Sequence, residues 1–209
     1  MAKLTIIDHP LVQHKLSLMR DKTTGVKEFR ELMAETAMLL CYEATRDLPL
    51  KTIETETPQG IAKSNIISGR KLAVVPILRA GLGMIDGVVK LIPAAKIGHI
   101  GMFRDPGTMT PVRYYTKFPD DIAEREVIVV DAMLATGTSA VEAINEVKSY
   151  GVKRVKYICI LCSPEGASHL MESHPDVEII CAGEDKGLNE NGYIIPGLGD
   201  SGDRLFGTK

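Results

Sequence analysis

The stretch VIVVDAMLATGTSA, residues 127–140, decides the fold of this chain of 209 residues. Four consecutive β-formers lead into an acid, and a short polar turn that contains a glycine follows. An amphipathic run then continues to Tyr150. The pattern predicts a buried parallel strand, a tight loop and the start of a helix.

The predicted loop is suited to binding an anion. Its successive backbone N–H groups and two hydroxyls lie at the N-terminus of the predicted helix, where unpaired donors and the helix dipole favour a phosphate. Asp131 is expected at the carboxyl end of the strand, where a carboxylate can accept hydrogen bonds from sugar hydroxyls. Together these features indicate a phosphorylated sugar as the ligand.

Two other phosphate-binding motifs do not match this stretch. A nucleoside-triphosphate P-loop needs a lysine before its Ser/Thr, and Gly137-Thr138-Ser139 has none. The dinucleotide fingerprint Gly-x-Gly-x-x-Gly does not follow the strand either. An ordinary strand, turn and helix with a polar cap remains the alternative, and the acid ahead of the turn makes it the less favoured one.

Composition limits the classes of protein that the chain can belong to. Its length suits one α/β domain with a small appendage. A net charge of -2 and a pI near 6.2 argue against a general nucleic-acid or membrane surface. No apolar run approaches the ~20 residues of a membrane span. The first residues lack the features of a signal peptide, and with four cysteines we expect a reduced, cytoplasmic setting.

The pair Cys159 and Cys162 forms a C-x-x-C motif inside a predicted strand. Residues three apart on a strand point to opposite faces, so the two thiols should not share one metal ion. No second C-x-x-C is present to complete a zinc site. We therefore interpret these two residues, with Cys41 and Cys181, as small buried hydrophobes.

Strands and helices alternate through the middle of the chain, which predicts a parallel sheet covered by helices. A helix is predicted over residues 26–46, where apolar residues recur at spacings of three and four. Thr52–Thr57 is interpreted as a sheet-edge strand, and residues 100–117 as a hairpin with a turn at Asp105-Pro106-Gly107. Further strands are predicted at 71–78, 96–100, 127–131, 155–161 and 177–181, and helices at 84–91, 140–150 and 165–173. The glycine-rich tail from Gly187 is interpreted as too irregular for a helix.

Ligands of such sheets bind beyond the carboxyl ends of the strands, where Asp131 and Arg79 fall, with Arg104 in the next loop region. Each arginine lies in apolar or turn sequence, so it needs an anionic partner: a di- or triphosphate, or a structural acid. The segment 199–204, Gly-Asp-Ser-Gly-Asp-Arg, would let backbone groups approach a flat ligand closely. None of the five histidines falls in a metal-like cluster, and no role is assigned to them.

These residues resemble the uracil phosphoribosyltransferases, a family of type I phosphoribosyltransferases, and the similarity covers essentially the whole chain. The terminal motif of residues 192–208, GYIIPGLGDSGDRLFGT, is highly specific to that family. Further matching motifs are Asp8-His-Pro-Leu, Lys27-Glu-Phe-Arg-Glu-Leu, Pro76-Ile-Leu-Arg-Ala-Gly, Arg104-Asp-Pro and Val130-Asp-Ala-Met-Leu-Ala-Thr-Gly.

The resemblance implies conversion of uracil and 5-phosphoribosyl 1-pyrophosphate to UMP and pyrophosphate, with Mg²⁺ held mainly through the donor. It implies a parallel-sheet core (about 20–182), a C-terminal hood (1–20 and 183–209) and a hairpin arm (about 100–117) that joins subunits. Arg79, Arg104 and Asp200 are the implied catalytic residues. The implied donor-binding residues are Arg79, Arg104, Asp131, Ala132, Met133, Leu134, Ala135, Thr136, Gly137, Thr138, Ser139 and Asp200. The implied uracil-binding residues are Ile194, Gly199, Asp200 and Ser201, with Asp200 also near the metal.

Several positions depart from the family pattern. Ala132 follows Asp131 where uracil enzymes usually have proline, and many type I relatives have a second acid, so only one carboxylate serves here. Thr138 replaces a residue that is often glycine. Lys186, Gly187 and Asn191 replace residues of the usual Asp-Glu-Arg-Leu-Asn-Asp-His-Gly, which puts in doubt any hood contact that the missing arginine and histidine make.

Two alternatives differ from the uracil enzyme. A purine or orotate phosphoribosyltransferase would show a double acid with a stacking aromatic residue, or a cation for the carboxylate of orotate. A regulatory protein of this fold that binds pyrimidine nucleotides and RNA would want a basic face, which 25 Lys+Arg against 27 Asp+Glu does not indicate. The sequence leaves open whether GTP activates the chain, and whether it is a homodimer or a homotetramer.

Overall fold

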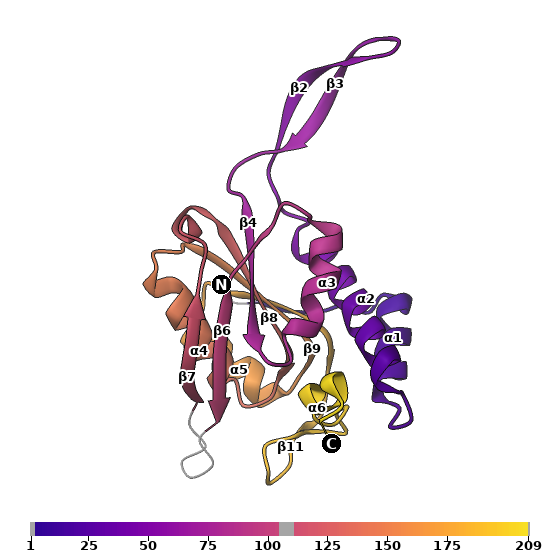
Figure 1. Cartoon of the computed structure of the whole chain (residues 1–209), viewed down its shortest axis with the longest axis vertical. Coiled ribbons are helices and arrows are strands. Elements are labelled where there is room, and N and C mark those ends of the chain that lie inside the picture. The colour runs from indigo at the N-terminus through magenta and orange to yellow at the C-terminus, as the bar shows by residue number, and fades with distance from the viewer. Residues whose placement is uncertain (1–2, 105–110, 209) are drawn as a thin grey trace.

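The computed structural model describes residues 3–208 apart from residues 105–110, and it does not describe the side chain of Arg104. The predicted turn at Asp105-Pro106-Gly107 therefore lies outside the described residues. Within the described part, a central sheet is covered by helices on both faces (Figure 1).

The central sheet has the strand order β1-β10-β9-β8-β4-β6-β7, and a short strand β5 also pairs with β4. Every pairing is parallel except that of β6 with β7, which is an antiparallel hairpin at one edge. The fold class predicted from the sequence, an α/β chain with a parallel-sheet core, is confirmed. The strands are β1 (Lys3–Ile6), β4 (Leu72–Leu78), β5 (Lys96–Ile97), β6 (His99–Arg104), β7 (Pro111–Lys117), β8 (Glu126–Leu134), β9 (Arg154–Cys162) and β10 (Glu178–Glu184).

Helices α2 (Val26–Ala44) and α3 (Leu82–Leu91) pack on one face of the sheet, with α1 (Pro10–Arg20) against α2. Helices α4 (Thr138–Ser149) and α5 (Pro164–Ser173) cover the other face. Strand side chains alternate between two hydrophobic clusters, so that Ile128 and Val130 join the first and Val127 and Val129 the second. This two-sided burial explains the unbroken apolar runs of the strands.

The hairpin that leaves the body of the molecule is not the predicted one. Strands β2 (Leu50–Thr57) and β3 (Gly60–Ile67) form a separate antiparallel pair, the arm, which projects from one end of the structure (Figure 1). The segment at 52–57 was predicted as a sheet-edge strand; it is a strand, but its sheet is this separate two-stranded pair and not the central sheet. The hairpin expected over residues 100–117 exists as β6 and β7, but it belongs to the central sheet. Alternation alone could not distinguish a sheet edge from a free hairpin.

The C-terminal part of the chain lies at the opposite end from the arm (Figure 1). We define residues 185–208 as the hood, which contains β11 (Gly187–Leu188), β12 (Ile194–Ile195) and α6 (Ser201–Phe206). The prediction that this tail is too irregular for a helix is wrong at α6. Its cap is readable in retrospect, because the Asp200 carboxylate accepts a hydrogen bond from the Asp203 N–H at 2.9 Å. Strand β1 pairs with β10, so residues 3–6 belong to the sheet, not to the hood as expected.

The C-x-x-C motif requires a correction of its geometry. Cys159 and Cys162 both lie in the second hydrophobic cluster with Cys181, because the alternation shifts by one residue between Ile160 and Leu161. All four cysteines are free and buried, as expected of packing residues. Over residues 3–104 and 111–208, no group of three or more His, Cys, Asp and Glu side chains could hold a metal ion. In the same residues, no helix is both long and apolar enough to cross a membrane.

Candidate active site

Strand β8 continues three residues beyond Asp131, to Leu134, and so ends later than predicted. Its pairing with β4 stops at Val130, whereas its pairing with β9 continues to the end of the strand. The β4 side of β8 is therefore open from Asp131 onward. The Asp131 carboxylate is oriented locally, because the Ala132 N–H donates a hydrogen bond of 2.7 Å to its Oδ1 atom.

Residues 135–139, here called the phosphate loop, comprise the turn that follows β8 and the first two residues of α4. Gly137 caps α4 with a φ of +80°, which favours glycine. A Cβ atom at this position would also lie 2.9 Å from the carbonyl oxygen of Gly166. The hydroxyls of Thr136 and Thr138 are hydrogen-bonded to each other at 2.8 Å. Beside the loop is a small cavity of about 60 Å³, which Asp131, Ala135, Gly137 and Ser139 help to line.

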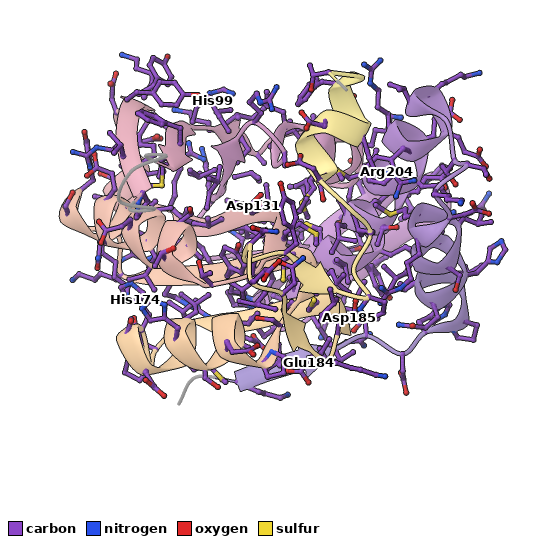
Figure 2. All side chains as sticks on the ribbon, turned by 90° about the horizontal axis from the view of Figure 1, so that it is seen from below. His99, Asp131, His174, Glu184, Asp185 and Arg204 are labelled. Atoms are coloured by element: carbon purple, nitrogen blue, oxygen red, sulfur yellow. The ribbon has the colours of Figure 1, made fainter. Side chains whose placement is uncertain are left out.

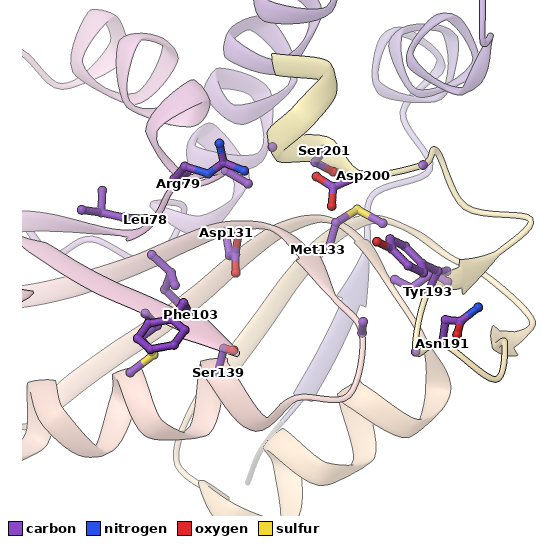
Figure 3. Close-up of a pocket in the computed structure, with 18 residues that line it drawn as sticks. Leu78, Arg79, Phe103, Asp131, Met133, Ser139, Asn191, Tyr193, Asp200 and Ser201 are labelled. Atoms are coloured by element: carbon purple, nitrogen blue, oxygen red, sulfur yellow. The ribbon is translucent and has the colours of Figure 1, made fainter. Parts of the chain in front are cut away.

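Arg79 follows β4 and reaches across the open side of the site (Figure 3). The peptide bond that joins it to Leu78 is cis. Its guanidinium lies 3.4 Å from the Asp203 carboxylate and 5.9 Å from the centre of the Phe206 ring. The arginine side chain is more than half exposed, and such a surface ion pair contributes little to stability. The guanidinium is therefore available to an anionic ligand.

Strand β8 with the phosphate loop forms one wall of the site, here called the Asp131 wall or donor wall, and the hood forms the second, the hood wall. Ile194, Gly199, Asp200 and Ser201 all line the same cavity as Arg79 and Asp131. Ser201 is buried, and its hydroxyl has no hydrogen-bond partner within the described residues. An unsatisfied buried hydroxyl is unfavourable, and a polar ligand in the cavity would satisfy it.

Two arginines tie the hood to the helices. Arg20 makes a bidentate pair with Asp185, at 2.7 Å to each carboxylate oxygen, and it also donates to the Gly197 carbonyl at 2.8 Å. Burial raises the pKa of Asp185, but the hydrogen bonds from Arg20 and from the Gly197 N–H outweigh this and lower the pKa overall. Arg204 donates to the carbonyls of Met19, Leu198 and Asp21, and its guanidinium stacks on the Phe29 ring at 4.4 Å.

The two walls enclose one cavity of about 390 Å³ (Figure 3). Figure 2 views the same end of the molecule, with Asp131 on the sheet and Arg204 and Asp185 on the hood side. The cavity brings together most of the residues that were expected to bind ligand: Arg79, Asp131, Met133, Ala135, Ser139, Ile194, Gly199, Asp200 and Ser201. Leu134 and Gly137 line the small cavity instead, and Ala132 is buried in the first hydrophobic cluster. Thr136 and Thr138 line neither of these two cavities, and the side chain of Arg104 is outside the described structure.

Several lining residues were not anticipated. Phe103 and Met102 come from β6, and Asn191, Gly192 and Tyr193 from the hood turn. Gly192 and Tyr193 entered the sequence analysis only as part of the terminal family motif, with no role assigned to them. Phe103 directly precedes the Arg104-Asp-Pro motif, and this position was a signal in the sequence that Phe103 lines the site. The resulting cleft offers hydrogen-bond donors and a cation to phosphates, a carboxylate to hydroxyls and a narrow backbone edge to a flat ring.

This sheet, with its cleft beyond the carboxyl ends of β4 and β8 and a hood across it, defines a type I phosphoribosyltransferase. The same fold occurs in adenine phosphoribosyl transferase from Trypanosoma brucei, solved with AMP, pyrophosphate and ribose-5-phosphate (TM-score 0.60, 10% identity, covering 92% of this chain and 88% of that one). The protein AQ2163 from Aquifex aeolicus is more similar, with a TM-score of 0.92, 35% identity and 97% of each chain covered.

Within that class, the chain belongs to the uracil phosphoribosyltransferase family. The family model for uracil phosphoribosyltransferase matches residues 6–208. The uracil phosphoribosyltransferase of Bacillus pumilus is 61% identical over the full length of both chains, and that of a Geobacillus strain is 60% identical. The family indicated by the sequence motifs is therefore confirmed.

Proposed function

We infer that the chain transfers the 5-phosphoribosyl group of 5-phosphoribosyl 1-pyrophosphate to N1 of uracil. The products are UMP and pyrophosphate, a step of pyrimidine salvage. The N1–C1′ bond forms as the bond from C1 to the pyrophosphate oxygen breaks, and the N1 proton is lost. The observation that carries the inference is the single cavity shared by the Asp131 wall and the hood wall, which suits one ligand with a charged end and one with a flat polar ring.

The donor half of the reaction is assigned to β8 and the phosphate loop. The N–H groups of the loop and the N-terminus of α4 would hold the 5′-phosphate, and the Asp131 carboxylate would accept hydrogen bonds from the ribose hydroxyls. Arg79 would neutralise charge on the departing pyrophosphate, which favours the oxocarbenium-like transition state. Arg104 is assigned the same task from its place in the sequence.

The uracil half is assigned to the hood. Main-chain groups around Ile194 and Gly199, with the Ser201 hydroxyl, would pair with the polar edge of the ring. Cytosine inverts donor and acceptor at one ring position, and a mismatched buried backbone group costs about 1–3 kcal/mol. A fixed backbone edge can therefore select uracil without a dedicated acid or base. No side chain is assigned as a general base.

Phosphoribosyltransferases generally use Mg²⁺ with the donor, and the residues present fit this ion. Magnesium is usually held by one or two carboxylates together with substrate phosphates and water. Asp200 is a carboxylate that lines the cavity, so it would complete a site made mostly by the donor. When bound, the ion supplies positive charge to the pyrophosphate.

The direct test is formation of UMP from radiolabelled uracil and the donor with Mg²⁺, run beside cytosine, orotate and hypoxanthine. Turnover with uracil alone is expected. Turnover with hypoxanthine or orotate would contradict the assignment of uracil as the base and would indicate a purine or an orotate phosphoribosyltransferase. Donor binding without turnover of any base, together with tight binding of leader RNA in a gel shift, would favour the regulatory alternative.

We further propose that the arm joins two copies of the chain in a homodimer. Leu50, Ile61 and Ile67 lie on one face of the arm, and each is at least 60% exposed. An isolated two-stranded hairpin is marginally stable in water, and such a face needs a partner. A second copy presents the same face, which suits a two-fold interface.

Sedimentation velocity can test the arm. The paired substitutions Leu50→Ser and Ile67→Ser should move the protein from dimer to monomer, because these cross-strand neighbours form the exposed apolar pair. Asn65→Ser on the same strand face is the matched control and should sediment as the unmodified protein does. A dimer that persists in the double variant would place the interface elsewhere.

The buried thiols of the chain are in keeping with a cytoplasmic location, which we also propose.

A further inference from the structure

Helix α5 and its N-cap residue Ser163 contact three successive carbonyl groups, the first at the end of β8 and the next two in the phosphate loop. The Ser163 N–H donates to the Leu134 carbonyl at 3.0 Å, and the Ser163 hydroxyl donates to the Ala135 carbonyl at 2.6 Å. His169 Nδ1 lies 2.9 Å from the Thr136 carbonyl. Because a carbonyl oxygen can only accept, Nδ1 must carry the proton of this hydrogen bond. The sequence pattern assigned no role to His169.

The backbones of α5 and the phosphate loop are in close van der Waals contact, with no space for an added side chain at the glycines between them. A Cβ atom at Gly166 would lie 2.2 Å from the Ala135 carbonyl oxygen, so only glycine permits this approach. A Cβ atom at Gly137 would lie 3.2 Å from Nδ1 of His169. The loop backbone therefore rests on the first two turns of α5, and the imidazole is one of the surfaces that support it.

The direction of these carbonyls fixes the direction of the loop N–H groups. In a trans peptide the C=O and the following N–H point in opposite directions, and the only cis bonds within residues 3–104 and 111–208 lie elsewhere. With the carbonyls of 134, 135 and 136 turned toward α5, the N–H groups of Ala135, Thr136 and Gly137 point away from it. Ala135 and Gly137 line the small cavity beside the loop. Successive N–H groups aimed at one space form an anion site.

We propose that His169 is a positioning residue for the donor phosphate, acting through the Thr136 carbonyl. This inference rests on the proposed function, in which the loop holds the 5′-phosphate. Without the imidazole donor, the Thr136–Gly137 peptide can rotate, and rotation replaces the Gly137 N–H by a carbonyl oxygen on the side of the phosphate. An oxygen there repels the anion, so the effect falls on ligands that carry the 5′-phosphate.

Two substitutions of similar polarity separate this role from a general effect on folding. His169→Asn places an amide N–H₂ near the position of Nδ1, whereas His169→Gln places it near the position of Nε2. Inhibition constants are measured against the donor for two probes, ribose 5-phosphate and pyrophosphate. In the Gln variant the ribose 5-phosphate constant should rise roughly 3- to 10-fold, the equivalent of one lost hydrogen bond. The pyrophosphate constant and the KM for uracil should stay within twofold.

The Asn variant should return the ribose 5-phosphate constant to within twofold of the unmodified protein. His14→Gln, at an exposed position on α1, is the control for loss of an imidazole. Equal constants in the Gln variant and the unmodified protein would overturn the inference alone. A parallel rise for both probes, or no recovery in the Asn variant, would also overturn it. Failure of ribose 5-phosphate to compete in the unmodified protein would instead overturn the assignment of the loop, and this inference with it.

Discussion

The two walls of the cleft are built in different ways. The wall of β8 and the phosphate loop is continuous with the central sheet, and main-chain ladders and α5 hold it in place. The hood has only short elements of its own, and a few side chains, chiefly Arg20 and Arg204, dock it against α1 and α2. The first wall inherits the rigidity of the core, whereas the second depends on individual polar contacts. Substitutions in the two walls should therefore affect different substrates.

The largest effect is expected from the donor wall. Asp131→Asn should lower kcat/KM for the donor roughly 10- to 100-fold, because hydrogen bonds to a charged group contribute about 1.5–3 kcal/mol. Steady-state kinetics with each substrate varied in turn is the measurement. Asp120→Asn, at an exposed position after β7, is the control for charge removal. Unchanged donor kinetics would remove Asp131 from the site.

A smaller effect, on the other substrate, is expected from the hood. Asp185→Asn keeps the shape of the side chain but can turn an N–H₂ group toward the Arg20 guanidinium, which breaks the bidentate pair. We expect the KM for uracil to rise about 5- to 10-fold and the free energy of unfolding to fall by about 1–3 kcal/mol. The KM for the donor should change less than twofold. An equal rise in both KM values would mean that the two walls are not independent.

The same pair makes a prediction for pH. The pKa of Asp185 in the folded chain lies below its ordinary value of 3.8, so its ionised form contributes stability above that value. This contribution is lost as the pH falls through the lower, folded-state pKa. In urea unfolding, the difference in stability between the unmodified protein and Asp185→Asn should be constant well above pH 3.8 and should shrink below it. A difference that does not depend on pH would assign the effect to packing.

A still smaller effect on the KM for uracil is expected when the Ser201 hydroxyl is removed, and this substitution should not destabilise the fold. Ser201→Ala removes a buried hydroxyl that has no hydrogen-bond partner in the described structure, so the free energy of unfolding should not fall. The KM for uracil should nevertheless rise about threefold, since the ring loses one hydrogen bond. Thermal unfolding and steady-state kinetics check the two parts. A loss of stability would show that the hydroxyl serves the fold and not the ligand.

The smallest effect is expected at Ala132, where the family resemblance led us to expect a proline. Its N–H orients the Asp131 carboxylate, and Ala132→Pro removes this donor. A rise in the KM for the donor of about two- to threefold is expected, because Asp131 keeps its charge and loses only one orienting hydrogen bond. Ala132→Gly retains the N–H and is the control. Identical donor kinetics for both variants would show that this hydrogen bond has no effect on catalysis.

The contrast between the walls also explains what the sequence could predict. The donor wall is local in sequence, because strand, loop and helix follow one another within residues 126–149, and periodicity with turn chemistry was enough to predict it. The hood is held by contacts such as Arg20 with Asp185, whose residues are far apart in the chain, and no local pattern contains them. The glycine-rich composition indicated only the segment 199–204 of the hood as ligand-binding, and the remaining hood residue, Ile194, was indicated by the family resemblance. The role proposed for His169 was hidden for the same reason.

Two differences in the fold have other physical causes. A strand of the arm and an edge strand of the central sheet share the same alternation of exposed and half-buried residues, so the pattern over 52–57 could not show that this strand pairs only with β3. Strand β1 is only four residues long, and too few positions alternate for a periodic signal. In both cases the missing information was the identity of the pairing partner, which tertiary structure supplies.

The pairing of β1 with β10 has a consequence for the order of events during synthesis. Lys3 is opposite Glu178, so β1 leaves the ribosome about 175 residues before its partner strand. At ~5–20 residues per second, this is a delay of roughly 10–35 s. Until then β1 has no template, and when β10 emerges its edge is open to any other extended segment. The pairing of β1 therefore completes this edge of the sheet only after β10 has been made.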